Sequence, residues 1–309
     1  MIFFLESKNR FLRFRCKGLN GRLFILYPPR RKTSLTVAFP ASTTADVPHL
    51  REKTFKLGFI GRTLAIFRVE KVLIYQDKPQ NQDFKVIKKI LDYISTPQYL
   101  RKSVFKLTPE LRYAGILPPL RTPDHPLKKY IKDLVEGEIR KGFVVKSLGE
   151  YSLVDVGVEK PIVVEANLKP KTQINLKIVK VDGKIKGEIV SWDSIPYYWG
   201  FKVEVVKQSL GWIVKHKNFD LKIATSKYGQ PIENVAGKLV EAWSNSKNVL
   251  VVFGSPSEGI KEILGREGLK PTDVFDFVLN TIKNQGTETV RVEEALNSTL
   301  AILNFLVEE

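Results

Sequence analysis

Two short stretches near the C-terminus combine glycine, hydroxyl and charged side chains in a spacing that suits ligand binding. The first, FGSPSEG at 253–259, follows the apolar run NVLVVF, which predicts a central strand. The pattern predicts that a helix then begins, with Ser255 as N-cap, Pro256 in the first turn and Glu258 as capping-box partner. Gly254 would let the backbone approach a ligand at the carboxyl edge of the sheet. Taken alone, however, the segment is explained more simply as a well-capped helix.

The second stretch, LNTIKNQGTET at 279–289, lies between the apolar run VFDFVL and the segment VEEALNSTLAILNFL at 292–306. The latter is apolar around most of its circumference, so we expect a buried helix. Polar loops with a pliable glycine, here Gly286, commonly form ligand sites at strand ends, although a purely structural loop has the same composition. Neither a GxGxxG turn after the first strand nor a P-loop occurs, so the candidate ligand loops lie near the C-terminus.

Alternating strands and helices must position these loops. Apolar, β-branched runs predict strands at TSLTVAFP (33–40), LAIFRV (64–69), KVLIYQD (71–77), WIVKH (212–216) and LKIAT (221–225). Helical spacing follows Asp46 and Pro48, where Asp46 is a candidate cap, and recurs in FKVIKKILDYIS and PIENVAGKLVEAWSN. This alternation predicts an α/β layer with a largely parallel sheet.

The middle of the chain has a different pattern. LPPLRTPDHP (117–126) contains four prolines in ten residues, which is typical of a linker. From about 138 to 190 only short strands are expected, and Asp182-Gly183 predicts a tight hairpin before the last of them. Short strands joined by tight turns predict a small OB-like barrel. We therefore expect an insert at 124–195 within an α/β domain made of 33–123 and 196–309. The insert carries Lys169, Lys171, Lys177, Lys180, Lys184 and Lys186.

The formal net charge of +17 favours a polyanionic partner, with nucleic acid as the leading candidate. A lysine-rich surface that keeps the protein soluble at high temperature is the alternative explanation. Residues 1–32 hold nine basic side chains against one acid, Glu6. Such an arm could bind phosphates, be a solvated tail, or reflect a misassigned start site.

Cysteine and histidine usage argues against several classes of protein. The single cysteine, Cys16, excludes an internal disulfide, and the three histidines lie far apart, so we expect no metal site. No long apolar run is free of charge, and the N-terminal apolar stretch is too short for a signal peptide. We expect a cytoplasmic protein without a membrane span.

Four segments carry a family resemblance: PHLREKTFKLGFIGR (48–62), LRYAGILPPLRTPDHPLKK (111–129), FGSPSEGIKEIL (253–264) and LNTIKNQGTETVRVEEALNSTLAILN (279–304). They resemble the RNA methyltransferase branch of the SPOUT superfamily shared by archaea and eukaryotes, over roughly Thr33 to Leu306. The resemblance implies a discontinuous α/β domain whose C-terminal segment threads a trefoil knot, an inserted OB-like domain, and a homodimer built around the knot. Physical reasoning alone would not propose a knot, because knots are rare.

The resemblance also implies that S-adenosylmethionine binds against the knotted loops, mainly through backbone amides and carbonyls. On this sequence the implied contacts are Thr225, Ser226, Gly229, Gly254, Pro256, Asn280, Thr281, Ile282, Gly286, Thr287 and Thr289. The chain departs from the expected pattern at Ala224, in place of glycine, and at Lys283, in place of proline. Both changes could loosen a loop, but neither removes an implied contact.

A sulfonium methyl is already activated, so such an enzyme mainly aligns donor and acceptor. A base is needed only if the target atom must lose a proton, and the candidate acids are Glu258, Glu288 and Glu293. A capping role explains Glu258 more simply, and a first-turn helix charge explains Glu293 more simply. Arg62, in the family motif FIGR, and Arg291 could hold a phosphate or polarise the target; a surface salt bridge explains Arg291 equally well.

Methylation of a pyrimidine C5 normally uses a cysteine nucleophile, and the sole cysteine, Cys16, lies outside the family domain. We therefore expect an S-adenosylmethionine-dependent enzyme that methylates a base nitrogen or a ribose oxygen of RNA, with ribosomal RNA as the expected substrate. A non-catalytic RNA-binding or ribosome-assembly factor that uses the barrel is the alternative. Calorimetry with S-adenosylmethionine discriminates between the two.

Overall fold

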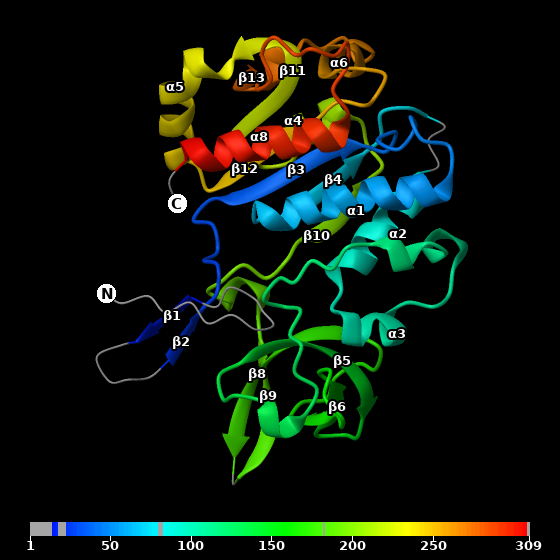
Figure 1. The fold of residues 1–309 in the computed structure, drawn as a ribbon, viewed down its shortest axis with the longest axis vertical. Coiled ribbons are helices and arrows are strands. Elements are labelled where there is room, and N and C mark those ends of the chain that lie inside the picture. The colour runs from blue at the N-terminus through cyan, green and yellow to red at the C-terminus, as the bar shows by residue number, and fades with distance from the viewer. Residues whose placement is uncertain (1–13, 18–22, 80–82, 182, 308–309) are drawn as a thin grey trace. The chain divides into compact units, whose positions relative to one another are not determined.

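The computed structural model describes residues 14–17, 23–79, 83–181 and 183–307, and the chain divides into two compact units (Figure 1). The first, here the barrel unit, comprises Met1–Arg30, Pro97–Val104 and Arg121–Trp199. The second, the sheet unit, comprises Arg31–Thr96, Phe105–Leu120 and Gly200–Glu309. Most of the basic arm at 1–32 lies outside the described residues; within it, β1 (Phe14–Lys17) pairs antiparallel with β2 (Leu23–Leu26).

A six-stranded sheet with the order β10-β4-β3-β12-β11-β13 forms the centre of the sheet unit. Every neighbouring pair is parallel, which confirms the predicted parallel α/β layer. The carboxyl ends of all six strands therefore lie at one edge. The strands are β3 (Ser34–Pro40), β4 (Lys71–Tyr75), β10 (Lys202–Val206), β11 (Leu221–Pro231), β12 (Asn248–Val252) and β13 (Phe277–Asn280).

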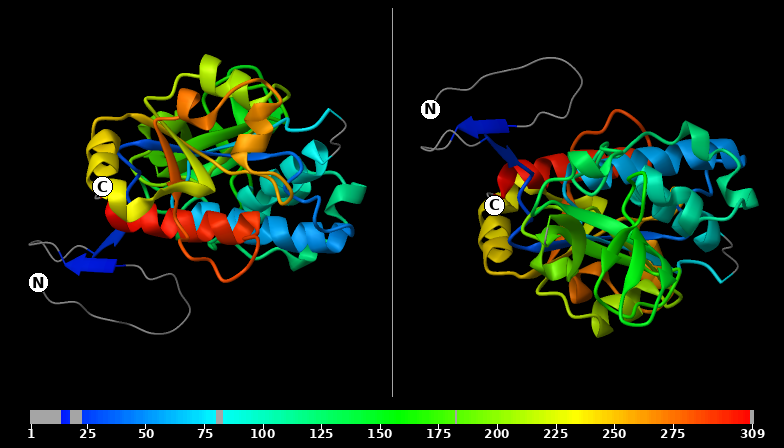
Figure 2. Two further views of the ribbon diagram at one scale, coloured as in Figure 1. Left: turned by 90° about the horizontal axis from the view of Figure 1, so that it is seen from above. Right: turned by 90° about the horizontal axis from the view of Figure 1, so that it is seen from below.

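Helices cover both faces of this sheet. The larger apolar cluster joins one face to α1 (Leu50–Ile66), α2 (Phe84–Ser95), α5 (Ile232–Ser244) and α8 (Val292–Leu306). The smaller cluster joins the other face to α4 (Leu210–His216), α6 (Ile260–Gly265) and α7 (Pro271–Val274). Figure 2 shows α1 and α8 running along the same side of the sheet. This three-layer arrangement buries the sheet on both faces, as parallel sheets require.

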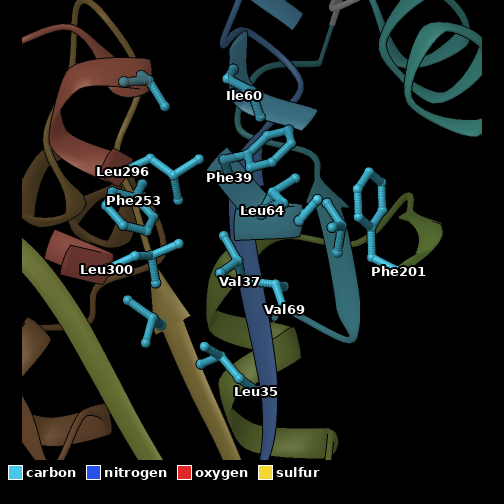
Figure 3. Packing of buried hydrophobic residues seen from close by; sticks show 14 of the residues in the cluster. Leu35, Val37, Phe39, Ile60, Leu64, Val69, Phe201, Phe253, Leu296 and Leu300 are labelled. Carbon is cyan, nitrogen blue, oxygen red and sulfur yellow. The ribbon is translucent and has the colours of Figure 1, made fainter. Parts of the chain in front are cut away.

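Strand β3 shows how the sequence produces these layers. Leu35, Val37 and Phe39 alternate along the strand and face the larger cluster, while Ala38 faces the smaller one. Figure 3 shows the three large side chains packed among residues of α1 and α8. All four residues are at most 1% exposed and Thr36 between them is 2% exposed, so the strand is buried on both faces.

Two predicted strands in the sheet unit are wrong. The segment 64–69 does not form a strand, because α1 continues to Ile66 and Leu64 lies on its buried face with Leu57 and Ile60. The segment 212–216 belongs to α4, which Ser209 caps by accepting the Trp212 N–H. Both are short apolar runs, for which periodicity does not separate a strand from one buried helix face.

The predicted cap of α1 is also wrong. The helix has His49 at its N-cap position without a side-chain cap. Asp46 instead accepts two hydrogen bonds of 2.7 Å from the ammonium of Lys56, which is 4% exposed. The same ammonium lies 3.1 Å from the carboxylate of Glu293 in the first turn of α8. Lys56 therefore links α8 to α1 and to the loop after β3.

Five strands of the barrel unit form a closed barrel in the order β5-β6-β7-β9-β8, which confirms the predicted barrel. They are β5 (Ile139–Ser147), β6 (Ser152–Asp155), β7 (Ile162–Val164), β8 (Gln173–Val181) and β9 (Lys184–Val190). Leucine, isoleucine and valine fill its interior. Val181 pairs with Lys184, and Gly183 has φ +73°, as a two-residue hairpin requires; Asp182 lies outside the described residues.

Short helical segments complete the chain. In the barrel unit these are η1 (Gln98–Leu100), α3 (Arg101–Val104), η4 (Ile131–Asp133) and η5 (Trp192–Ser194). In the sheet unit they are η2 (Pro109–Leu111) and η3 (Ala114–Ile116). Within the residues that the structure describes, no helix combines the length and the apolar character needed to cross a bilayer.

A buried ion cluster attaches the proline-rich segment to the barrel. Asp124 is fully buried; its carboxylate lies 2.5 Å from the Lys141 ammonium on β5 and 3.1 Å from His125 Nδ1. Burial opposes the charged carboxylate, but Lys141 and His125 outweigh this effect and hold the pKa of Asp124 below its ordinary value. The interaction is therefore stabilising at neutral pH.

Candidate functional site

A pocket opens at the carboxyl ends of β12 and β13 and beside the middle of β11 in the sheet unit. Thr225 and Ser226 on β11, Phe253 and Gly254 after β12, and Asn280 at the end of β13 contribute to its lining. The first turns of α8 close it from another side through Val292, Ala295 and Thr299. Hydroxyl and amide groups thus alternate with apolar side chains around one cavity. Such a wall suits an organic ligand that has both an apolar part and hydrogen-bonding groups.

The loop after β12 is a tight turn rather than the start of a helix. Glu258 N–H donates to Ser255 Oγ at 2.9 Å, and Ser255 N–H donates to the Glu258 carbonyl at 2.8 Å. Helix α6 begins at Ile260 with Gly259 as its N-cap, so the predicted capping box of Ser255, Pro256 and Glu258 is wrong. The run of serine, proline and glycine favours a turn by itself.

Side chains from outside the loop fix this turn. The Glu258 carboxylate lies 2.9 Å from Arg266 Nη1 and 3.7 Å from the Lys78 ammonium. Arg266 also donates to the Asp77 carbonyl at 2.6 Å, and Tyr75 Oη donates to the Phe253 carbonyl at 2.8 Å. Burial is the main cause that raises the pKa of Tyr75 well above its ordinary value, so the phenol stays protonated as this donor. The ends of β4 and β12 therefore hold the loop.

Internal hydrogen bonds shape the loop between β13 and α8. Asn280 Nδ2 donates to the Lys227 carbonyl at 2.9 Å, and its Oδ1 accepts the Ile282 N–H at 3.0 Å. The hydroxyls of Thr281 and Thr299 lie 2.8 Å apart. Gln285 Nε2 donates to the carbonyls of Thr287 and Glu288 at 2.9 and 3.0 Å. The polar side chains that made this segment a candidate ligand loop also determine its conformation.

The structure brings together most, but not all, of the residues implied to bind the cofactor. Eight of the eleven line the pocket: Thr225, Ser226, Gly254, Pro256, Asn280, Thr281, Ile282 and Thr289. Gly229, Gly286 and Thr287 do not line it. A Cβ built on Gly286 would meet no protein atom within 4 Å, whereas one on Gly254 would lie 2.8 Å from the Glu258 carbonyl oxygen. The individual cofactor contacts remain predictions.

The candidate catalytic residues are distributed differently. Glu288 lines the pocket, whereas Arg62 and Arg291 do not. Arg62 Nη1 donates to the carbonyls of Pro119 and Leu120 at 2.9 and 3.1 Å, which holds the proline-rich segment to α1. Arg291 is the N-cap residue of α8, and its N–H donates to the Glu294 carboxylate at 3.0 Å. Within one chain, only Glu288 of this group lies at the pocket.

Sequence reasoning missed several lining residues, among them the exposed Lys227 and Tyr228. The predicted strand ended at Thr225, and nothing in SKYG indicated which side chain would point to solvent. Lys261, Glu262 and Gln285 also line the pocket. Among the described residues, no group of three or more histidine, cysteine, aspartate or glutamate side chains is arranged to hold a metal ion.

Comparison with known proteins gives the family context of this pocket. A family model described as "Putative RNA methyltransferase" matches residues 34–303, which is most of the chain. A human 28S rRNA (uridine-N(3))-methyltransferase is 28% identical over 88% of this chain and 78% of its own length. The mouse protein of the same name is 30% identical over 88% of this chain and 76% of its length. An uncharacterized Halobacterium salinarum protein is 30% identical over 87% of this chain and 98% of its length.

Proposed function

This chain belongs to the family of RNA methyltransferases, and from that premise we propose that it transfers the methyl group of S-adenosylmethionine to a base nitrogen of ribosomal RNA. The names of the human and mouse relatives favour N3 of a uridine as the target. The observation that carries the proposal is the pocket at the ends of β12 and β13, beside the middle of β11. We expect the reaction to occur in the cytoplasm.

The residues of the pocket fit S-adenosylmethionine chemically. Ile282, Val290 and Ala295 are half-buried and offer apolar surface for an adenine ring. Thr225, Ser226, Asn280 and Thr281 offer hydroxyl and amide groups for a ribose and an amino acid. When bound, the cofactor supplies a methyl group that its sulfonium charge has already activated. The chain must then align the acceptor and remove the proton from an N–H target.

Among the acids considered, Glu288 is the one that we propose as proton acceptor. It lines the pocket, and among the described residues it is the candidate acid that has no ion pair. Glu258, by contrast, is paired with Arg266 and Lys78, and Glu293 with Lys56. Both of these carboxylates are held by cations of the protein and are therefore less available to the target base. Arg62 and Arg291 do not line the pocket of their own chain, so they would contribute to catalysis only across the homodimer that the family resemblance implies.

Labelled S-adenosylmethionine and ribosomal RNA from a strain that lacks the gene provide the test. We expect the protein to transfer label to this RNA, and mass spectrometry of its nucleosides to find a methylated base that is missing from the deletion strain. A protein that binds the RNA but shows no affinity for S-adenosylmethionine at millimolar concentration would instead be a non-catalytic RNA-binding or assembly factor.

We propose further that two copies pair through α1 and α8 and that the C-terminal segment threads the family's knot. An apolar stripe supports the pairing: Phe55, Phe59 and Ile66 on α1 and Phe305 on α8 are 45 to 85% exposed. Exposed apolar patches of this kind commonly mark protein interfaces. A contact of each copy with the same surface of the other makes a closed dimer.

The dimer gives a direct prediction. The wild-type protein should sediment as a dimer at micromolar concentration, and Phe55→Glu should shift it toward the monomer because a charge enters an apolar interface. Leu107→Glu is the matched control, since Leu107 is fully exposed but lies outside the stripe. Sedimentation of the wild-type protein as a monomer throughout would contradict the proposed assembly.

We propose that the insert at 124–195 binds RNA mainly through phosphates. Lys169, Lys171, Lys180 and Lys184 are exposed, and Lys186 is half-buried 2.5 Å from Glu165. Each phosphate contact on single-stranded RNA contributes about −0.7 to the slope of log affinity against log salt. Replacing the five lysines with alanine should therefore weaken RNA binding and flatten this slope, while binding of S-adenosylmethionine stays unchanged. An unchanged slope would mean that RNA binds elsewhere.

A further inference from the structure

Strand β11 is interrupted where it passes the pocket. Thr225 and Gln230 both lie opposite Leu279 of β13, so residues 226–229 leave the hydrogen-bonded ladder between them. Irregularities of this kind re-aim side chains and are common beside active sites. Here the excursion carries Ser226, Lys227 and Tyr228 to the pocket, which all three line.

The excursion is fixed at several points. Ser226 Oγ accepts a hydrogen bond from the Tyr228 N–H at 3.2 Å, and the Lys227 carbonyl accepts one from Asn280 Nδ2 at 2.9 Å. Gly229 packs directly on β13, because a Cβ built there would lie 2.7 Å from the Leu279 carbonyl carbon and the Val278 oxygen. Tyr228 therefore projects from an anchored backbone rather than from a free loop.

The tyrosine ring itself is largely uncovered. Tyr228 is 77% exposed, whereas Phe253, the other aromatic residue among the described residues of the pocket wall, is 1% exposed. The Lys227 ammonium lies 5.2 Å from the centroid of the Tyr228 ring and 3.4 Å from the Glu288 carbonyl oxygen. An exposed aromatic face and a cation thus meet beside the proposed proton acceptor.

We propose that Tyr228 stacks on the target base and holds it at the pocket mouth, with the Lys227 charge beside the RNA backbone. This inference rests on the proposed function, because it assigns the RNA acceptor to the same pocket. A base nitrogen is reached only when the base is unpaired and turned out of its stack. Enzymes and RNA-binding proteins hold such a base against an aromatic ring. Tyr228 is a positioning residue in this scheme, and it takes no part in proton transfer.

Single variants of the full-length protein test this role with deletion-strain ribosomal RNA as the probe. Tyr228→Ala should lower kcat/KM for the RNA about ten- to hundredfold, which is the range that loss of one base–aromatic stack produces. Its Kd for S-adenosylmethionine, measured by calorimetry, should be unchanged. Tyr228→Phe keeps the ring and should restore nearly all of the activity.

Trp212→Ala is the control. Trp212 on α4 is 39% exposed and stacks on His216 with ring centroids 4.8 Å apart, but it lies outside both the pocket and the insert at 124–195. This variant should methylate RNA as the wild type does. The inference is overturned if Tyr228→Ala is fully active, if Tyr228→Phe is as impaired as Tyr228→Ala, or if cofactor affinity falls in parallel. If the wild-type protein transfers no methyl group, the proposed function fails before any variant is compared, and the inference fails with it.

Discussion

Replacing Gly254 with alanine should weaken S-adenosylmethionine binding about ten- to hundredfold, as expected when a side chain is forced into a closely packed site at a cost of about 1–3 kcal/mol. The added Cβ would lie 2.8 Å from the Glu258 carbonyl oxygen and 3.1 Å from the Gly259 Cα, which are both backbone atoms. Because Glu258 is anchored by Arg266, the loop cannot simply move away. Isothermal titration calorimetry measures the effect.

Gly237→Ala is the control for this substitution. Gly237 lies within α5, and a Cβ built there would meet no atom within 4 Å. The variant should bind the cofactor with wild-type affinity and should fold at least as stably, since alanine is the better helix former. If Gly254→Ala also binds normally, the loop after β12 does not form the cofactor wall.

Replacing Asp124 with asparagine should lower the free energy of unfolding of the barrel unit by about 3–5 kcal/mol at pH 7, the usual cost of removing one partner from a buried ion pair. Asp124 is fully buried, and the substitution leaves the Lys141 ammonium, whose side chain is 12% exposed, without its carboxylate. Urea denaturation followed by far-ultraviolet circular dichroism measures this loss. The pair Glu165–Lys186 in the same unit is far less buried and gives the control, because Glu165→Gln should cost less than about 1 kcal/mol.

The pH dependence of the Asp124 effect has a definite sign. The folded-state pKa of Asp124 is below its ordinary value, so its contribution is complete above the unfolded-state pKa of about 3.9. As the pH falls below that value, the unfolded chain takes up a proton that the folded chain does not, and the contribution declines. The stability difference between wild type and Asp124→Asn should therefore shrink below about pH 4. A difference that stays constant down to pH 2 would contradict the ion pair as its cause.

Some of this architecture can be predicted from local pattern, and some cannot. The five barrel strands are short and bounded by turn residues, and β12 is a continuous apolar run, so sequence periodicity predicts both. By contrast, Leu64 and Ile213 belong to buried helix faces. Each lies in a short run of apolar and β-branched residues, and such a run has the same sequence pattern as a buried strand. Arg62 and Arg291 have residue types suited to catalysis, yet their partners are backbone groups and a neighbouring glutamate.

The candidate site, too, has parts that local sequence predicts and parts that depend on tertiary packing. Glycine, proline and hydroxyl residues indicated two loops after strands, and both loops line the pocket. The contribution of Tyr228 depends on the register between β11 and β13, which are separated along the chain by α5, β12 and the helices after it. No local pattern encodes that register, so the exposure of this ring could be found only from the folded structure.

The strand order of the sheet has a consequence for biosynthesis. The central strand β3 ends at Pro40, but its neighbour β12 begins at Asn248. At a synthesis rate of about 5–20 residues per second, β3 therefore emerges about 10–40 seconds before this partner exists. The barrel strands are local in sequence and can pair during that interval, while the apolar edge of β3 stays unprotected. We expect nascent chains truncated before β12 to hold a folded barrel and to recruit chaperones through the unfinished sheet.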